Sequence, residues 1–219
     1  MNKLPTVTKD TLSDKAYKII KEAIISNNYK PGDVLVEEAL AEQLNISRTP
    51  IRDALKRLLY EHIIVQEDNK KLVVSTISLD DIRDVTVVRS SLEELAVQLL
   101  EGKMDKSKKK TLQKLADKCA SIVENGIEGN EVDYLEADYN FHMFIAECSG
   151  NSYLIDMIEK VSFVTKRFHT LSGTLDRYSQ TATEEHSRVV SAILEDNYEE
   201  ASKAMHSHIC LVGERMPIK

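Results

Sequence analysis

Along most of this chain, apolar residues recur every three or four positions, which is the spacing of one face of an α-helix. Gly and Pro are scarce, 7 and 4 of the 219 residues, so long helices are easily accommodated and loop-rich β folds are disfavoured. In the C-terminal two thirds the pattern predicts an antiparallel bundle of six or seven helices. The predicted spans there are 79–101, 106–125, 131–149, 152–170, 180–196 and 198–216.

The N-terminal third has shorter apolar stripes, which predict three helices. Two of them span 13–26 and 37–44, and the third begins near Ser47 or Thr49. The three residues Asn45-Ile46-Ser47 match the length of the turn in a helix-turn-helix. Pro50 is compatible with the first turn of the third helix, where its missing N–H has no helical partner.

Two short apolar runs, 63–65 and 72–74, follow the third helix and predict the strands of a small β-wing. We therefore expect a mainly α protein of two domains. Residues 1–76 form a winged helix-turn-helix with three helices and a small β-wing. Residues 77–219 form the all-helical antiparallel bundle.

A row of cations lies along one edge of the third predicted helix. Arg48, Arg52 and Lys56 are four residues apart, so they share that edge, and Arg57 lies close to it. A helix with cations on an exposed edge suits the major groove of double-stranded DNA. The alternative is an ordinary solvated helix face, but the turn length and the wing favour DNA contact.

The net charge of −7 is unevenly distributed. Residues 1–76 carry 12 Lys and Arg and 11 Asp and Glu, a net charge of +1, whereas the remainder has a net charge of −8. DNA binding must then depend on a local basic patch rather than on overall charge. Lys70 and Lys71 of the predicted wing would extend this patch by meeting phosphate.

Four polar side chains are expected to face the interior of the helical bundle. Asp138 and His142 are four residues apart and share a helix face, and His186 falls in an apolar stripe of its own helix. Of His206 and His208, only His208 lies in line with the apolar residues of the last helix. One carboxylate and three imidazoles would be costly to bury without compensation, and a divalent cation would satisfy all four. This donor set suits Zn²⁺, with Ni²⁺ or Mn²⁺ as alternatives, unless each group is separately hydrogen-bonded.

Arg89 is a further polar residue inside an apolar stripe, on the predicted helix 79–101. A buried guanidinium needs an anionic partner. One possibility is an internal ion pair with Glu93. The other is that Arg89 binds the carboxylate of a small organic acid that also ligates the metal.

Cysteine usage and hydropathy indicate the compartment. Cys119, Cys148 and Cys210 are widely spaced and form no CxxC pair, so a disulfide framework is not expected. The sequence contains no run of about 18 apolar residues, so a membrane-spanning helix is not expected. The first 15 residues lack the apolar core of a signal peptide. We expect a cytoplasmic protein without membrane contact.

The stretch PGDVLVEEALAEQLNISRTPIRDALKRLLYEHIIV resembles the GntR family of bacterial regulators, with SRTPIRDAL as its most specific part. The resemblance covers most of residues 13–76. It implies operator contacts from Arg48, Thr49, Arg52 and Arg57.

Two positions depart from this family pattern. The family commonly has Gly after the Glu that ends the recognition helix, where this chain has His62. A positive φ is uncommon for non-Gly residues, although His tolerates it better than most, so we expect strain at this helix end. The wing also lacks its usual Gly.

The stretches DYNFHMFIAECSGN, EEHSRVVSAILEDN and ASKAMHSHI resemble the effector domain of the FadR-like branch of that family, over about residues 79–215. The resemblance implies a metal held by one Asp and three His, and it favours effector binding by Arg89. Carried over to this sequence, the metal ligands are Asp138, His142, His186 and His208.

These features together predict a ligand-responsive bacterial transcription regulator and not an enzyme. A homodimer would bind an inverted-repeat operator, and a small organic acid in the metal pocket would shift the equilibrium between two states. A direct metal sensor without an organic effector is one alternative. A metal-dependent hydrolase is another, but no further acid or base that could act as its general base is evident on these helix faces.

Overall fold

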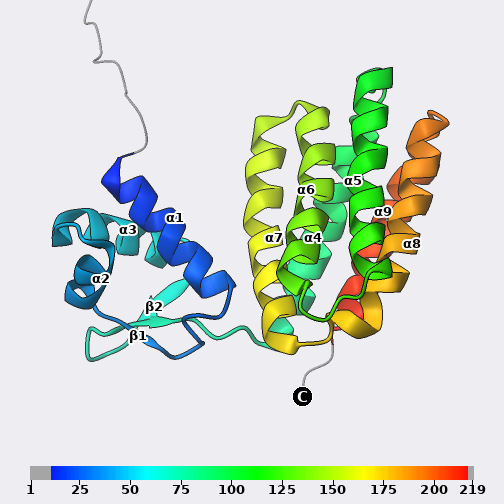
Figure 1. The fold of residues 1–219 in the computed structure, drawn as a ribbon. Helices are drawn as coiled ribbons and strands as arrows, with labels where there is room; N and C mark the ends of the chain where they lie inside the picture. The colour runs from blue at the N-terminus through cyan, green and yellow to red at the C-terminus, as the bar shows by residue number, and fades with distance from the viewer. Residues whose placement is uncertain (1–10, 217–219) are drawn as a thin grey trace, which may run out of the picture. The chain divides into compact units, whose positions relative to one another are not determined.

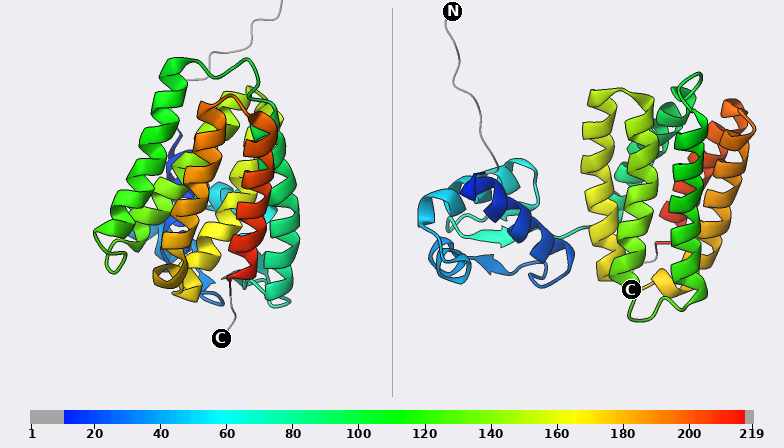
Figure 2. Two further views of the ribbon diagram at one scale, coloured as in Figure 1. Left: turned by 90° about the vertical axis from the view of Figure 1, so that its right-hand side faces the viewer. Right: turned by 45° about the horizontal axis from the view of Figure 1, so that its top comes forward.

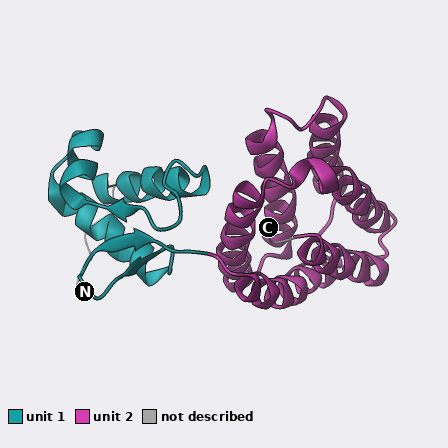
Figure 3. Ribbon diagram, turned by 90° about the horizontal axis from the view of Figure 1, so that it is seen from below, with its two compact units in different colours: residues 1–76 teal, residues 77–219 magenta. Residues whose placement is uncertain are grey.

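The computed structural model describes residues 11–216 and divides the chain into two compact units. The first unit comprises residues 1–76 and the second residues 77–219 (Figure 3). Most of the segment that bears on a signal peptide lies outside the described residues.

Residues 11–76 form three helices and a small antiparallel sheet, which lies to one side of the helices (Figure 1). The core forms where the first and second helices pack on the third, and Ile20, Ile51 and Leu55 are fully buried there. The elements are α1 (Leu12–Ile25), β1 (Val34–Leu35), α2 (Glu37–Leu44), α3 (Arg48–Tyr60), β2 (Ile64–Gln66) and β3 (Leu72–Val74).

The sheet has the strand order β1-β3-β2, so β3 is its central strand. Val34 of β1 is paired with Val73 of β3, and Val65 of β2 is paired with the same residue from the other side. The wing predicted from the two apolar runs is present. The strand β1 has no counterpart in the sequence pattern, because two residues are too few to display a period.

Among the residues of this unit with a positive φ, two lie where the chain departs from the expected glycine pattern. His62, just after α3, has a φ of 57°, which confirms the positive φ expected at this helix end. Lys70, in the turn of the wing, has a φ of 63°. The wing therefore forms without Gly, with a Lys in the left-handed region.

The part of the second unit that the structure describes is a bundle of six helices, as the periodicity predicts (Figure 2). Along the chain, the first of these helices packs on the sixth and also contacts the third and the fourth. The elements are α4 (Leu79–Gln98), α5 (Lys106–Glu124), α6 (Glu131–Ser149), α7 (Ser152–Ser172), α8 (Leu175–Leu194) and α9 (Tyr198–Glu214).

The largest difference from the sequence prediction is the start of α8. This helix begins at Leu175 rather than at 180, because α7 ends at Ser172, its C-cap Gly173 is in the left-handed region, and the chain re-enters a helix almost at once. The N-cap of α8 is Thr174.

The main cluster of the bundle core is apolar, and a polar layer lies within the bundle. Phe141, Ile145 and Ile193 are fully buried in the main cluster. The polar layer consists of buried charged and imidazole side chains from α4, α6, α8 and α9, which belong to the site described below. Within residues 11–216, no helix is long and apolar enough to cross a membrane.

Candidate functional site

The exposed edge of α3 carries the cations that the sequence predicts. The Arg52 side chain donates to Glu37 through Nε at 3.1 Å and through Nη2 at 2.9 Å. Arg48 forms an ion pair with Glu38. Both glutamates belong to the first turn of α2, and both arginine side chains remain more than half exposed. The pairs are therefore open to exchange with an external anion.

Arg57 is held more firmly than its neighbours on α3. It pairs with Asp14 of α1 at 2.7 Å and lies 3.9 Å from the centroid of the Tyr17 ring. Its guanidinium thereby fastens α3 to α1. Lys56, in contrast, is exposed, and its Nζ lies 3.5 Å from Oδ1 of Asp53. This long, solvent-exposed ion pair is weak.

The remaining residues that the sequence predicts to contact DNA are exposed. Thr49 lies in the first turn of α3, and Lys70 and Lys71 lie at the turn of the wing. They thus meet the first requirement of a contact surface, which is access to solvent.

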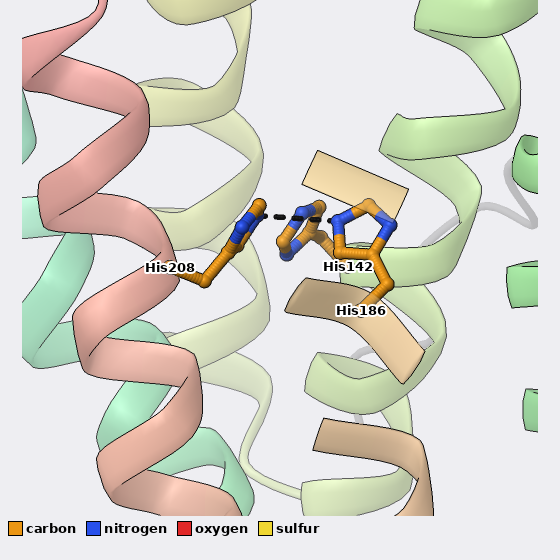
Figure 4. Close-up of side chains that lie close together, drawn as sticks. All are labelled: His142, His186 and His208. Carbon is orange, nitrogen blue, oxygen red and sulfur yellow. Dashed lines mark hydrogen bonds between the residues drawn. The ribbon is translucent and has the colours of Figure 1, made fainter. Parts of the chain in front are cut away.

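In the second unit, three imidazoles from three helices point toward one another (Figure 4). His142 comes from α6, His186 from α8 and His208 from α9, and each is at most 2% exposed. Asp138, one turn before His142, completes the group with a side chain that is 23% exposed. The side chains meet because all four positions fall on the inner faces of their helices.

The separations within this group are close to those of ligand atoms around a single ion, with the three histidine ligand atoms within 4.8 Å of one another. The Nε2 atoms of His186 and His208 are 3.2 Å apart. Oδ1 of Asp138 is 3.5 Å from Nε2 of His186 and 3.8 Å from Nε2 of His142. Ligand atoms at about 2.0–2.2 Å from a tetrahedral ion are separated by roughly 3.3–3.6 Å. The residues present therefore fit a bound divalent metal.

Two of the histidines have their other ring nitrogen held by a buried carboxylate. Nδ1 of His142 contacts Glu93 of α4, and Nδ1 of His208 is 2.8 Å from Oε2 of Glu185. Nε2 of His142, by contrast, is buried and has no hydrogen-bond partner among the described residues. A buried nitrogen without a partner is unfavourable unless something else satisfies it, and a metal ion would do so.

The electrostatic surroundings set the protonation states of these groups. Burial lowers the pKa of His186 well below its usual value, and burial also lowers the pKa of His208 although Glu185 opposes this. Burial alone would raise the pKa of Glu93, but the charges of Arg89 and His142 outweigh it and lower that pKa to about 2. The lowered pKa values of His186 and His208 favour the neutral imidazoles that metal ligation requires.

Arg89 forms one of the two interactions that its sequence position suggests, and it also lines a cavity. Its Nε donates to Oε1 of Glu93 at 2.6 Å, so the internal ion pair is present. Arg89 also lines a small cavity of about 30 Å³ together with Asp138 and His208. The same cavity is bordered by Arg215, whose guanidinium donates to Glu185 through Nη1 at 3.1 Å.

His169 of α7 is a further polar residue on the wall of this cavity. Its Nδ1 is buried without a hydrogen-bond partner in the described chain, and burial lowers the pKa of the ring to about 4. His169 is therefore a neutral hydrogen-bonding group beside Asp138 and Arg89.

Two families match this chain. Residues 12–74 match the bacterial regulatory proteins of the gntR family, and residues 84–210 match the FCD domain. The chain belongs to the GntR family. It is a DNA-binding transcription regulator with an FCD effector-binding domain, as the sequence resemblance implies.

Similar proteins agree with this assignment. This GntR regulator is 26% identical over 192 residues to the HTH-type transcriptional regulator YdhC of Bacillus subtilis (strain 168), covering 88% of this chain and 85% of that protein. It is 22% identical to the HTH-type transcriptional repressor RspR of Escherichia coli (strain K12), covering 93% and 88%. The family and these relatives are transcriptional regulators, not enzymes.

Among solved structures, the fold is similar to E. coli McbR/YncC, with a TM-score of 0.78 at 20% identity, covering 95% of this chain and 100% of that one. A GntR regulator from Rhodococcus sp. RHA1 gives the same TM-score at 18% identity, covering 93% and 96%. These likenesses confirm the fold class expected from the sequence.

The structure brings all four predicted metal ligands of this GntR regulator into one cluster. The two carboxylates that contact Nδ1 of His142 and His208 were not predicted in that role. Glu93 was expected only as a partner of Arg89, and Glu185 was not expected at the site. A signal for Glu185 exists, because it lies between Ala182 and Val189 on the buried side of α8. The cavity contributions of His169 and Arg215 have no comparable sequence signal.

Proposed function

We propose that the FCD domain binds a divalent metal ion through Asp138, His142, His186 and His208. The observation that carries the proposal is the convergence of the three histidine ligand atoms within 4.8 Å of one another in a buried site. Zn²⁺ suits this His and carboxylate set best, and Ni²⁺ or Mn²⁺ are alternatives.

We further propose that a small organic acid is the effector and binds beside the metal. Asp138 is the most exposed member of the group and, with Arg89, faces the small cavity. The metal would supply a Lewis-acidic anchor for a carboxylate oxygen, and Arg89 would donate hydrogen bonds to the same carboxylate. Because the cavity of about 30 Å³ has room for roughly two water molecules, its walls must move to admit such an effector.

The regulator would act as a homodimer on an inverted-repeat operator in the cytoplasm. Each α3 would enter a major groove, with Arg48, Thr49 and Arg52 at base edges and Lys56 at phosphate. Arg57, Lys70 and Lys71 would add backbone contacts. An effector shifts this equilibrium only if it binds the DNA-competent state and the other state with different affinity.

A direct metal sensor is the second candidate, and the small size of the cavity favours it. In that case the ion itself would be the signal, and no organic molecule would have to enter. The two candidates differ in the event that changes DNA affinity. In a direct sensor it is the binding of the metal ion, and in an effector-responsive regulator it is the binding of an organic acid to the metal-loaded protein.

The test uses the full chain and a duplex selected with it from a random-sequence pool. DNA affinity is measured by fluorescence anisotropy after metal removal by a chelator, after reloading with Zn²⁺, and after addition of acetate, lactate or malonate. The effector proposal predicts that a carboxylate changes the affinity only of the zinc-loaded protein. A change caused by zinc alone, with no carboxylate effect, supports direct sensing. A protein that binds no zinc refutes both candidates.

A further inference from the structure

Two histidines of the cluster belong to the same three-residue arrangement, in which an arginine donates to a glutamate and the glutamate contacts the Nδ1 atom of the histidine. Arg89 donates to Glu93, and Glu93 contacts Nδ1 of His142. On the other side of the cluster, the guanidinium of a second arginine donates to Glu185, which in turn contacts Nδ1 of His208. Each glutamate therefore lies between an arginine and a histidine.

These contacts determine which ring nitrogen faces the ion site. A carboxylate can only accept a hydrogen bond, so a neutral imidazole beside it carries its proton on Nδ1. Nε2 then presents its lone pair to the site. In His142 this Nε2 atom is the buried one without a hydrogen-bond partner among the described residues.

The third histidine is oriented in another way. Nδ1 of His186 has no hydrogen-bond partner in the described part of the chain. Its ring lies against Phe141, with the ring centroids 4.3 Å apart. Packing thus positions His186, whereas carboxylates position the other two rings.

We infer that Glu93 and Glu185 are positioning residues of the ion site, each fixing the Nδ1–H tautomer and the orientation of one metal-binding histidine. Arg89 and Arg215 hold these carboxylates in place from the far side. This inference rests on the proposed metal binding. Outer partners of this kind typically contribute about 10- to 100-fold to metal affinity, because they orient the ligand and raise its basicity.

The chain provides matched controls for both glutamates. Glu94 and Glu184 are their sequence neighbours, and neither contacts a histidine of the cluster: Glu94 pairs with His206, and Glu184 accepts from Gln180. We would compare Glu93→Gln and Glu185→Gln with Glu94→Gln and Glu184→Gln in the full chain. Zn²⁺ affinity is measured by competition with a chromogenic chelator.

We expect a loss of about 10- to 100-fold in Zn²⁺ affinity for each of the first two variants and wild-type affinity for the two controls. Glu93→Gln leaves the Arg89 guanidinium in the core without a carboxylate, so the double variant Arg89→Met/Glu93→Gln is measured beside it and should show the same loss. If both Glu93→Gln and Glu185→Gln retain wild-type affinity, the inference is wrong.

A second measurement does not depend on zinc. Proton–nitrogen correlation spectra of the metal-free chain report the tautomer of each imidazole. We expect Nδ1–H for His142 and His208, and an Nε2–H tautomer for either ring overturns the inference at that ring. A wild-type protein that binds no zinc would refute the proposed function, and the tautomers would still decide this inference.

Discussion

The cations of α3 and the histidine cluster of the FCD domain are both polar groups at helical spacing, but the first are exposed to solvent and the second are buried. On α3, Arg48 and Arg52 pair with glutamates at the surface, where solvent and other anions compete. In the FCD domain, Glu93 and His142 are buried, and each partner is itself held by another group. The first arrangement can exchange its partners for phosphate at little cost. The second is organised in advance for one kind of ligand, because buried charges left alone are strongly unfavourable.

The sharpest test of this contrast is to remove one charge from the buried network. Arg89→Met leaves the Glu93 carboxylate in the core without its guanidinium. We expect the free energy of unfolding of the metal-free FCD domain to fall by about 3–5 kcal/mol. Because the chain has no Trp, urea unfolding is followed by circular dichroism.

Arg83→Met is the matched control on the same helix. Arg83 pairs with Asp80 at 2.9 Å, and both side chains are exposed. Loss of this surface pair should change the free energy of unfolding by less than about 1 kcal/mol. Equal effects of the two substitutions would show that burial does not distinguish the two kinds of ion pair.

Removal of a ligand should have the next largest effect, on metal affinity. His186→Ala deletes one of the converging Nε2 atoms, so the Zn²⁺ affinity should fall by more than the roughly 10- to 100-fold typical of an outer partner. Competition with a chelator measures it.

His206→Ala is the control for this substitution. His206 is partly exposed, pairs with Glu94 at 2.9 Å and lies outside the cluster. Its loss should leave Zn²⁺ affinity unchanged. If His186→Ala binds zinc as tightly as the wild type, the cluster is not the metal site.

The sequence predicts the fold well where apolar periodicity is long, as in α5, α6 and α9. It fails where the signal is short or polar: β1 has two residues, and the first turns of α8 are mostly polar. Helix starts are also displaced by local caps. For example, α1 begins after Thr11, which forms a capping box with Asp14, rather than at Ser13.

The candidate site is predictable only in part. Helical phase identifies Asp138, His142, His186 and His208 as inward residues, because phase is a property of each helix alone. The pairing of Glu93 with His142 depends on how α4 packs on α6, and that relation between helices has no local signal. Whether the group binds metal remains a prediction.

On the surface side of the contrast, Arg52→Ala should weaken specific DNA binding while leaving the fold intact. A bidentate arginine–base contact contributes about 1–3 kcal/mol of discrimination. The Glu37 pair that is lost is exposed, so the free energy of unfolding should change by less than about 1 kcal/mol. Gel shifts on the selected duplex and on a scrambled duplex measure the discrimination, and unchanged affinity for the selected duplex would refute the assignment.

The smallest effect should come from Lys56→Ala. Lys56 is exposed and only loosely paired with Asp53, so in the complex it is free to neutralise a phosphate. Such a contact carries no base information, and affinity should therefore fall equally for the selected and scrambled duplexes. The slope of log affinity against log salt should decrease in magnitude by about 0.9, the value for one released counterion. A loss confined to the selected duplex would instead place Lys56 at a base edge, and the division of α3 into base-reading arginines and a phosphate-binding lysine would have to be redrawn.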